Sequence, residues 1–287
     1  MLQRSTIQLL RFHFSYFLMP VFWFALSFVK DISIPRAVAA FIILHLIVYP
    51  SSNGYNSYMD RDETSIGGIK NPLQPTQQLF ITTVIMDVTA AILSFVLSPW
   101  FGLCIACYII CSRLYSYRKI RLKRYPIAGY LTVILNQGSL TFFMVYIVAN
   151  TAHSLNTPLA GVIASAFLIG GFYPITQIYQ HESDRRDGVT TLSMLLGKRG
   201  TFIFCAAMYM VALSILFFYY QQANELQSFG IIQIFFVPVL VYFVWWFLKV
   251  WKQEQLADFK HTMQINWLAS TCTSLAFITL ICLQQFG

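Results

Sequence analysis

Residues 37–60 of this chain read AVAAFIILHLIVYPSSNGYNSYMD, an apolar run that ends in a cluster of amides and one acid. From Ala37 to Tyr55 the run contains no Asp, Glu, Lys or Arg. Its length is close to the ~20 residues that a helix needs to cross the hydrocarbon of a bilayer. The stretch therefore predicts a membrane-spanning helix whose polar end, beginning at Asn56, lies at the membrane surface.

The same pattern recurs along the whole chain of 287 residues. Only 10% of the residues are charged and 57% are hydrophobic, whereas about 25% of a soluble domain is charged. The sequence predicts a single all-α, polytopic membrane bundle over residues 1–287 with nine transmembrane helices. Their predicted ranges are 13–29, 37–55, 79–97, 100–114, 127–149, 159–178, 202–220, 231–250 and 265–283.

The basic residues predict the orientation of this bundle. With nine spans, all but two of the 19 Lys and Arg residues fall on the side that carries the N-terminus, the exceptions being Lys30 and Arg36. The positive-inside rule then places the N-terminus in the cytoplasm and the C-terminus outside, in a protein integral to the cytoplasmic (inner) membrane. The same rule explains the net charge of +8, so the expected partner is membrane lipid and not nucleic acid.

Two short loops on the predicted cytoplasmic side contain most of the acidic residues. They follow the second and sixth spans, and they contain six of the eleven carboxylates: Asp60, Asp62, Glu63, Glu182, Asp184 and Asp187. The simpler interpretation is that both loops are solvated and that their acids balance the charge of nearby Arg residues. The spacing favours a functional site, because Asn56 and Asp60 would share one helix face, as would Gln177, Gln180 and Asp184.

Paired carboxylates beside a membrane suit a metal-bridged diphosphate. Mg²⁺ is commonly held by one or two carboxylates together with substrate phosphates. The predicted metal ligands are Asp60, Asp62, Glu63, Asp184 and Asp187. The basic run 118–124 lies on the same side, and we expect Lys123 and Arg124 to bind phosphate while its other residues anchor the membrane surface. Tyr115 and Tyr117 end a span beside this site and could stabilise a cation through their rings.

One further acid lies within a span. Asp87 is about two turns from the cytoplasmic end of the predicted third helix. An acid inside a membrane helix indicates either a functional residue or one that pairs with a neighbouring side chain. Both interpretations stay open from the sequence.

Four segments resemble the UbiA-type intramembrane prenyltransferases. Residues 56–61 (NSYMDR) look like the start of that family's N-x-x-x-D-x-x-x-D motif, and 70–75 (KNPLQP) are similar to its N-K-P-x-R-P segment. Residues 115–116 (YS) with 121–126 (RLKRYP) resemble its Y-S…L-K-R-x-P loop, and 184–197 resemble its D-R-x-x-G-x-x-T-L…L-G segment. The sequence departs from the family pattern at Thr64 and Gln180, where acids are expected, and at Gln74, where Arg is usual.

The resemblance implies an enzyme that transfers a prenyl group from an isoprenoid diphosphate to an acceptor, with Mg²⁺ as cofactor. It implies that Asn56, Asp60 and Asp184 are catalytic, and it adds Lys70 to the substrate contacts together with Gln177 and Gln180. The expected acceptor is a small aromatic such as a quinone precursor, or another lipophilic molecule. Two alternatives remain open: a prenyl diphosphate cyclase of the same fold, and a non-catalytic lipid-binding or transport protein that kept the fold.

Overall fold

A computed structural model describes residues 1–152 and 154–286, and over that range the chain is helical. Nine helices in the described range are long and apolar enough to cross a membrane, as predicted. The first five spans comprise α1 (Arg4–Leu9), η1 (Phe12–Leu18) and α2 (Met19–Leu26); α3 (Ile34–Ile42), η2 (Ile43–Val48) and α4 (Tyr49–Asp60); α5 (Gln77–Leu97); α6 (Pro99–Ser116); and α7 (Pro126–Val133), η4 (Ile134–Leu140) and α8 (Thr141–Ala149). The last four are α9 (Leu159–Gln177), α11 (Leu192–Gln222), α12 (Leu226–Lys252) and α13 (Phe259–Phe286), while η3 (Leu122–Arg124), α10 (His181–Arg186) and η5 (Glu254–Leu256) lie in connections.

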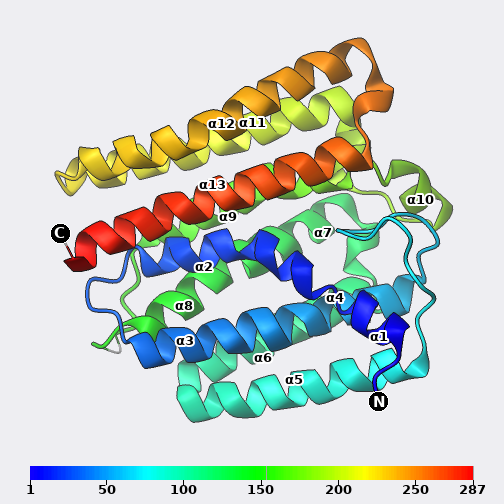
Figure 1. Ribbon diagram of the computed structural model, residues 1–287, viewed down its shortest axis with the longest axis horizontal. Helices are drawn as coiled ribbons and strands as arrows, with labels where there is room; N and C mark the ends of the chain where they lie inside the picture. Colours follow the sequence, from blue (N-terminus) through cyan, green and yellow to red (C-terminus); the bar gives the residue numbers. More distant parts are fainter. Residues whose placement is uncertain (153, 287) are drawn as a thin grey trace.

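The spans lie side by side in one bundle, with the two chain termini at opposite ends (Figure 1). The end that carries the N-terminus also carries α10, the end of α4 and the start of α7 (Figure 1). Aromatic side chains fill the interior: the Phe24 ring lies 4.7 Å from Phe277 and 5.1 Å from Phe142, centroid to centroid. The two acidic loops are therefore brought to one end of the bundle.

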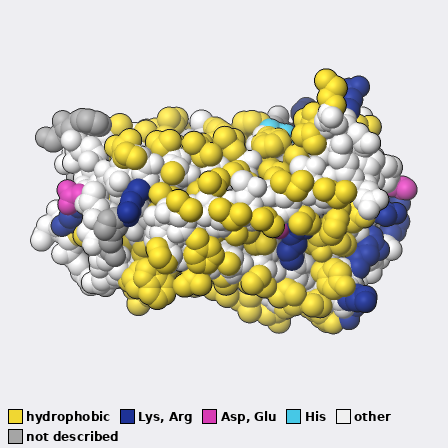
Figure 2. Space-filling view, turned by 90° about the horizontal axis from the view of Figure 1, so that it is seen from below, with side chains coloured by type: hydrophobic (Ala, Val, Ile, Leu, Met, Phe, Trp, Pro, Cys, Tyr) yellow, Lys and Arg dark blue, Asp and Glu magenta, His cyan; other side chains and the backbone are white. Residues whose placement is uncertain are grey.

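The outer surface is that of a multi-pass integral membrane protein. On the face seen in Figure 2, apolar side chains cover the middle of the bundle and most Lys and Arg side chains gather at one end. Large apolar side chains such as Val96, Ile234 and Val241 are more than half exposed. In water such a surface would drive aggregation, whereas in a bilayer it contacts lipid tails.

Two spans contain a π-helical segment, η2 in the second and η4 in the fifth. In η4, Gly138 lies so close to α9 that an added Cβ would be 2.7 Å from the Cα of Ala166. Small residues allow such close approach of helices in membranes. The first span also differs from the predicted 13–29: it begins at Arg4 and bends at Arg11, whose backbone is left-handed (φ 48°).

Candidate functional site

A cavity of about 210 Å³ lies where α4, α6, α9 and α10 meet. The carboxylates of Asp60, Asp62, Asp184 and Asp187 line it, together with the Lys123 ammonium. Residues from the two acidic loops, more than a hundred positions apart in the chain, thus surround one space.

The C-terminal end of α4 positions Asn56 and Asp60. The helix continues to Asp60, as the spacing of Asn56 and Asp60 requires, and ends at Arg61, which is left-handed (φ 56°). The Asn56 side-chain oxygen accepts a hydrogen bond from the Ser116 hydroxyl of α6 (3.1 Å). Arg118 donates to the backbone oxygens of Met59 (2.6 Å) and Asp60 (3.2 Å). A cation is favourable at such a helix end, since its last carbonyls have no partner within the helix.

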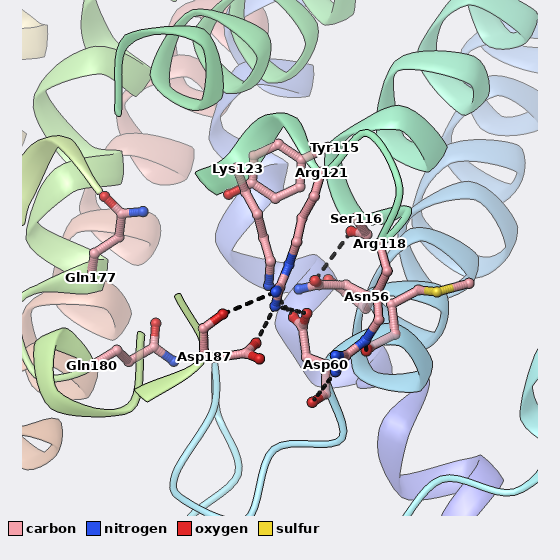
Figure 3. A network of polar contacts seen from close by, with 12 residues as sticks. Asn56, Asp60, Tyr115, Ser116, Arg118, Arg121, Lys123, Gln177, Gln180 and Asp187 are labelled. Atoms are coloured by element: carbon pink, nitrogen blue, oxygen red, sulfur yellow. Dashed lines mark hydrogen bonds and ion pairs between the residues drawn. The ribbon is translucent and has the colours of Figure 1, made fainter. Parts of the chain in front are cut away.

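Basic side chains from the loop between α6 and α7 join the two acidic segments (Figure 3). The Arg121 guanidinium forms an ion pair with Asp187 and lies 3.3 Å from the Asp60 carboxylate. Lys123 forms an ion pair with the other oxygen of Asp60. These contacts hold Asp60 with its side chain only 4% exposed. The loop between α6 and α7 and both acidic segments therefore share one charged network.

Helix α10 and the turn after it position the second acidic segment. The Asp184 backbone amide donates to the Gln180 backbone oxygen (2.9 Å), and the Val189 backbone amide donates to the Asp184 backbone oxygen (2.9 Å). Gly188 adopts φ 67° and ends the helix, as the sequence predicts. Glycine adopts this conformation without the steric cost that other residues carry.

The pKa values of Asp184 and Asp62 are perturbed. Burial raises the pKa of Asp184 to about 7, which Lys123 opposes and Asp62 reinforces. Burial also raises the pKa of Asp62 to about 6, with a further contribution from Asp60. Perturbed acids in a cleft indicate a functional site. An added cation would relieve both effects, because it favours the ionised form.

The donor chemistry of the cavity fits a hard divalent cation such as Mg²⁺. Carboxylate and amide oxygens surround it, and Mg²⁺ prefers oxygen ligands. Within the described residues no three His, Cys, Asp or Glu side chains converge closely enough to hold a metal ion alone. Asp60 and Asp187 instead engage Arg121 and Lys123. The acids therefore suit a cation that also takes ligands from a substrate.

The other predicted residues divide into two groups. Tyr115, Gln177 and Gln180 line the cavity. The Tyr115 and Tyr173 hydroxyls share a hydrogen bond (2.5 Å), and Gln177 donates to Tyr173 (2.9 Å). Four residues lie outside the cavity lining and are exposed: Glu63, Lys70, Tyr117 and Arg124. Arg124 stacks on the adjacent Tyr125 ring, 4.7 Å from its centroid, instead of facing the acids.

Sequence reasoning missed the role of Arg121. The available signal was its position two residues before Lys123 in the basic run. Arg121 is left-handed (φ 49°) at the start of η3, and this backbone conformation directs its side chain toward the acids. A basic run gives no periodicity from which such a turn can be recognised.

Asp87 belongs to a separate ion pair behind the site. Arg113 Nε donates to Asp87 (2.7 Å), and its guanidinium lies 3.9 Å from the Tyr55 ring centroid. The Ser51 hydroxyl donates to Asp87 (2.6 Å). The pair therefore ties α5 and α6 to α4, the helix that presents Asn56 and Asp60.

Part of the cavity lining is apolar. Phe17, Ile169 and Phe172 line the cavity and also line a second cavity of about 40 Å³ between α2, α9 and α13. Aromatic and aliphatic side chains dominate that second space. An apolar cavity thus lies beside the cavity that the acids border.

An all-helical membrane bundle with acids and bases around a polar entrance defines the class of protein. The model of the UbiA prenyltransferase family matches residues 17–269, most of the chain. The chain belongs to the UbiA prenyltransferase family. A search of curated proteins finds no match.

Solved structures share the fold at low sequence identity. The UbiA homologue of Archaeoglobus fulgidus bound to DMAPP and Mg²⁺ has a TM-score of 0.73 and 16% identity, over 96% of this chain and 99% of that one. The apo UbiA homologue of Aeropyrum pernix K1 has a TM-score of 0.68 and 16% identity, over 94% and 98%. A digeranylgeranylglyceryl phosphate synthase has a TM-score of 0.62 and 15% identity, over 97% and 98%.

Proposed function

We propose that this protein is a Mg²⁺-dependent prenyltransferase that moves a prenyl group from an isoprenoid diphosphate to a small aromatic acceptor within the membrane. We further propose that residues 1–287 act as one domain. One observation carries the proposal: the acidic ends of α4 and α10 border a single cavity together with Lys123, and that cavity shares apolar lining residues with a second, apolar cavity. The A. fulgidus homologue has been solved bound to DMAPP and Mg²⁺.

Arg121 and Lys123 would change partners when the donor binds. In the structure Arg121 pairs with Asp187 and Lys123 pairs with Asp60. Diphosphate oxygens would accept the same hydrogen bonds, so that the carboxylates would be freed from the two basic side chains. Asn56, Asp60 and Asp184 would then be the principal protein ligands of the metal. When bound, Mg²⁺ would supply Lewis-acid stabilisation of charge on the diphosphate oxygens. Asp62 and Asp187 border the same space and would complete the set.

The apolar part of the cavity would hold the prenyl chain. The allylic C–O bond breaks with its electron pair leaving on the diphosphate oxygen, and the acceptor attacks the allylic cation and then loses a proton. Phe172, Tyr115 and Tyr173 line the cavity and would present aromatic rings to that cation. The surrounding apolar side chains would exclude water, which would otherwise capture it.

The test uses purified full-length protein in detergent or lipid with Mg²⁺ and a panel of labelled prenyl diphosphates, with and without aromatic acceptors. Diphosphate release that requires an acceptor supports the transferase. Release accompanied by a cyclic hydrocarbon would instead indicate a cyclase. Absence of any Mg²⁺-dependent binding or turnover would contradict the enzymatic proposal and favour a non-catalytic lipid-binding or transport protein.

We also propose that the basic end of the bundle faces the cytoplasm, with the C-terminus outside. The gathering of Lys and Arg at one end supports this orientation (Figure 2). Alkaline phosphatase fused to the C-terminus should then be active, and an inactive, stably inserted fusion would reverse the assignment.

A further inference from the structure

The second cavity lies deeper in the bundle than the acids. Its lining comes mainly from α2, α9 and α13, which lie side by side (Figure 1). Phe17 and Phe172 line both cavities. Phe24 and Phe277 lie farther along their helices, toward the end opposite the acids, and line the second cavity. A prenyl chain whose diphosphate binds beside the acids would therefore extend toward this space.

The volume of the second cavity limits what can enter it. The cavity measures about 40 Å³, whereas an engineered cavity of about 150 Å³ holds one benzene molecule. Benzene has six carbon atoms and an isoprene unit has five, so the second cavity accommodates less than one isoprene unit. A chain can place its first unit in the large cavity and only part of a second unit beyond it.

Fully buried aromatic rings form the far wall of the second cavity. Phe24 and Phe277 are both 0% exposed, and their ring centroids lie 4.7 Å apart. The Phe24 ring also lies 5.1 Å from the Phe142 ring. Phe142 packs so closely on Gly161 that a Cβ added there would lie 2.2 Å from the Phe142 ring. An interior packed in this way has few voids into which the rings could move, so they form a fixed end wall.

One hydroxyl group makes the second cavity a poor site for hydrocarbon. Ser270 of α13 lines the cavity and is only 1% exposed. Within the part of the chain that the structure describes, its hydroxyl has no hydrogen-bond partner. A prenyl chain has neither a donor nor an acceptor, so it would shut this hydroxyl off from water without satisfying it.

Aromatic contacts also close the seam between η1 and α13. The Trp267 ring lies 4.9 Å from the Tyr16 ring and 5.1 Å from the Phe17 ring. The Tyr16 and Thr271 hydroxyls share a hydrogen bond (2.7 Å). Trp267 is 48% exposed, so the seam faces the lipid. A chain too long for the interior would have to break these contacts in order to leave the bundle here.

We propose that the prenyl donor is a short allylic diphosphate of one or two isoprene units, and that Phe24 and Phe277 limit the length of its chain. The inference rests on the proposed prenyl transfer and names the donor class for that same site. The first isoprene unit would lie against Phe17, Ile169 and Phe172. A second unit would reach the small cavity and end at its aromatic wall, and a third unit would collide with that wall.

The experiment measures equilibrium binding of labelled prenyl diphosphates to purified full-length protein with Mg²⁺ and without an acceptor, so that no turnover is needed. The probes are DMAPP, geranyl diphosphate and farnesyl diphosphate, which have one, two and three isoprene units. Wild-type protein is compared with Phe277→Ala and Phe24→Ala. Phe101→Ala is the matched control, because Phe101 is also fully buried (0% exposed) but lies on α6 and lines neither cavity.

We expect wild-type protein to bind farnesyl diphosphate about tenfold or more weakly than DMAPP, since one methylene group in a closed apolar pocket already changes discrimination by about 10- to 200-fold. Phe277→Ala and Phe24→Ala each remove a ring from the end wall. Both should tighten the binding of farnesyl diphosphate relative to DMAPP by about tenfold or more. Phe101→Ala should keep the wild-type ratio. Phe277→Leu should shift the ratio in the same direction by less, and it serves as the test if the alanine variant does not fold.

Two results would overturn the inference: farnesyl diphosphate that binds to wild-type protein as tightly as DMAPP, or a ratio that stays unchanged in the Phe24 and Phe277 variants. Either result would leave the prenyl-transfer proposal intact, because a prenyl diphosphate still binds with Mg²⁺. If none of the three donors binds with Mg²⁺, the prenyl-transfer proposal itself fails, and the donor class that rests on it fails as well.

Discussion

Replacing Asp87 by Ala should destabilise the bundle by leaving the Arg113 guanidinium without its carboxylate. The two side chains are only 15% and 21% exposed, and Arg113 donates to Asp87 through Nε (2.7 Å) and also through a second nitrogen. Removing one partner of a buried pair costs about 3–5 kcal/mol. Polar contacts between membrane helices average about 0.6 kcal/mol, with a maximum near 1.7. For this partly exposed pair we therefore expect about 2 kcal/mol, roughly a 30-fold change in the unfolding equilibrium.

The assay is reversible unfolding in mixed micelles, with circular dichroism as the probe. A double-mutant cycle with Arg113→Met supplies the control, because Asp87→Ala/Arg113→Met removes both charges together. The double variant should be more stable than Asp87→Ala alone. Additive losses, with the double variant the least stable of the three, would refute the idea that the uncompensated guanidinium causes the destabilisation.

Three further predictions concern the metal site, the pH dependence and the helix packing. Asp60→Asn and Asp184→Asn should each abolish Mg²⁺-dependent turnover and leave the circular dichroism spectrum unchanged. Thr64→Asp should leave Mg²⁺ affinity unchanged, because Thr64 is exposed and outside the cavity lining. Turnover by Asp60→Asn, or tighter Mg²⁺ binding by Thr64→Asp, would contradict the assignment of the metal ligands. Burial, with repulsion from Lys198 and Arg185, lowers the pKa of His181 from 6.5 to about 4. Between these two pH values the unfolded chain therefore binds more protons than the folded chain. The stability that the neutral ring contributes is present above pH 6.5 and is lost as the pH falls toward 4. His181→Gln should lose less stability than wild type between pH 6.5 and 4, and identical profiles in thermal unfolding would exclude His181 as the cause. Gly138→Ala should lower the free energy of unfolding by about 1–3 kcal/mol through overpacking against Ala166. Gly230→Ala is the control: the added methyl group meets no neighbouring side chain or helix within 4 Å, so this variant should be neutral or slightly stabilising. Equal unfolding temperatures for the two variants would contradict the packing argument.

The fold was predictable because apolar length alone specifies membrane helices. Nine spans follow from composition, and the end of α4 follows from the spacing of Asn56 and Asp60. The detail of the site was less accessible. Lys123 faces the acids and Arg124 does not, although both belong to one basic run, since a left-handed residue at 121 determines which side chains turn inward.

Among the described residues, Asn53 and Asn266 each have a buried side-chain amide nitrogen without a hydrogen-bond partner, and this could not have been found from sequence. Asn53 and Asn266 are ordinary polar residues near or inside apolar runs, and such residues most often bond a neighbouring helix. Only the three-dimensional arrangement shows that they border the same cavity and lack partners. Asp87 was equally ambiguous until its contact with Arg113 was known, because a partner on another helix leaves no mark in local spacing.

The π-helical segments η2 and η4 have a consequence for comparing this chain with its relatives. Each residue of an α-helix turns the chain by about 100°, so one extra residue accommodated in a π turn rotates everything beyond it to a new face. Asn136 and Gln137 lie within η4, where that change of face begins, and both line the large cavity. An alignment that allows gaps only in loops would pair these residues with lipid-facing positions of a relative that lacks the π turn. Single-residue gaps should therefore be permitted inside the second and fifth spans.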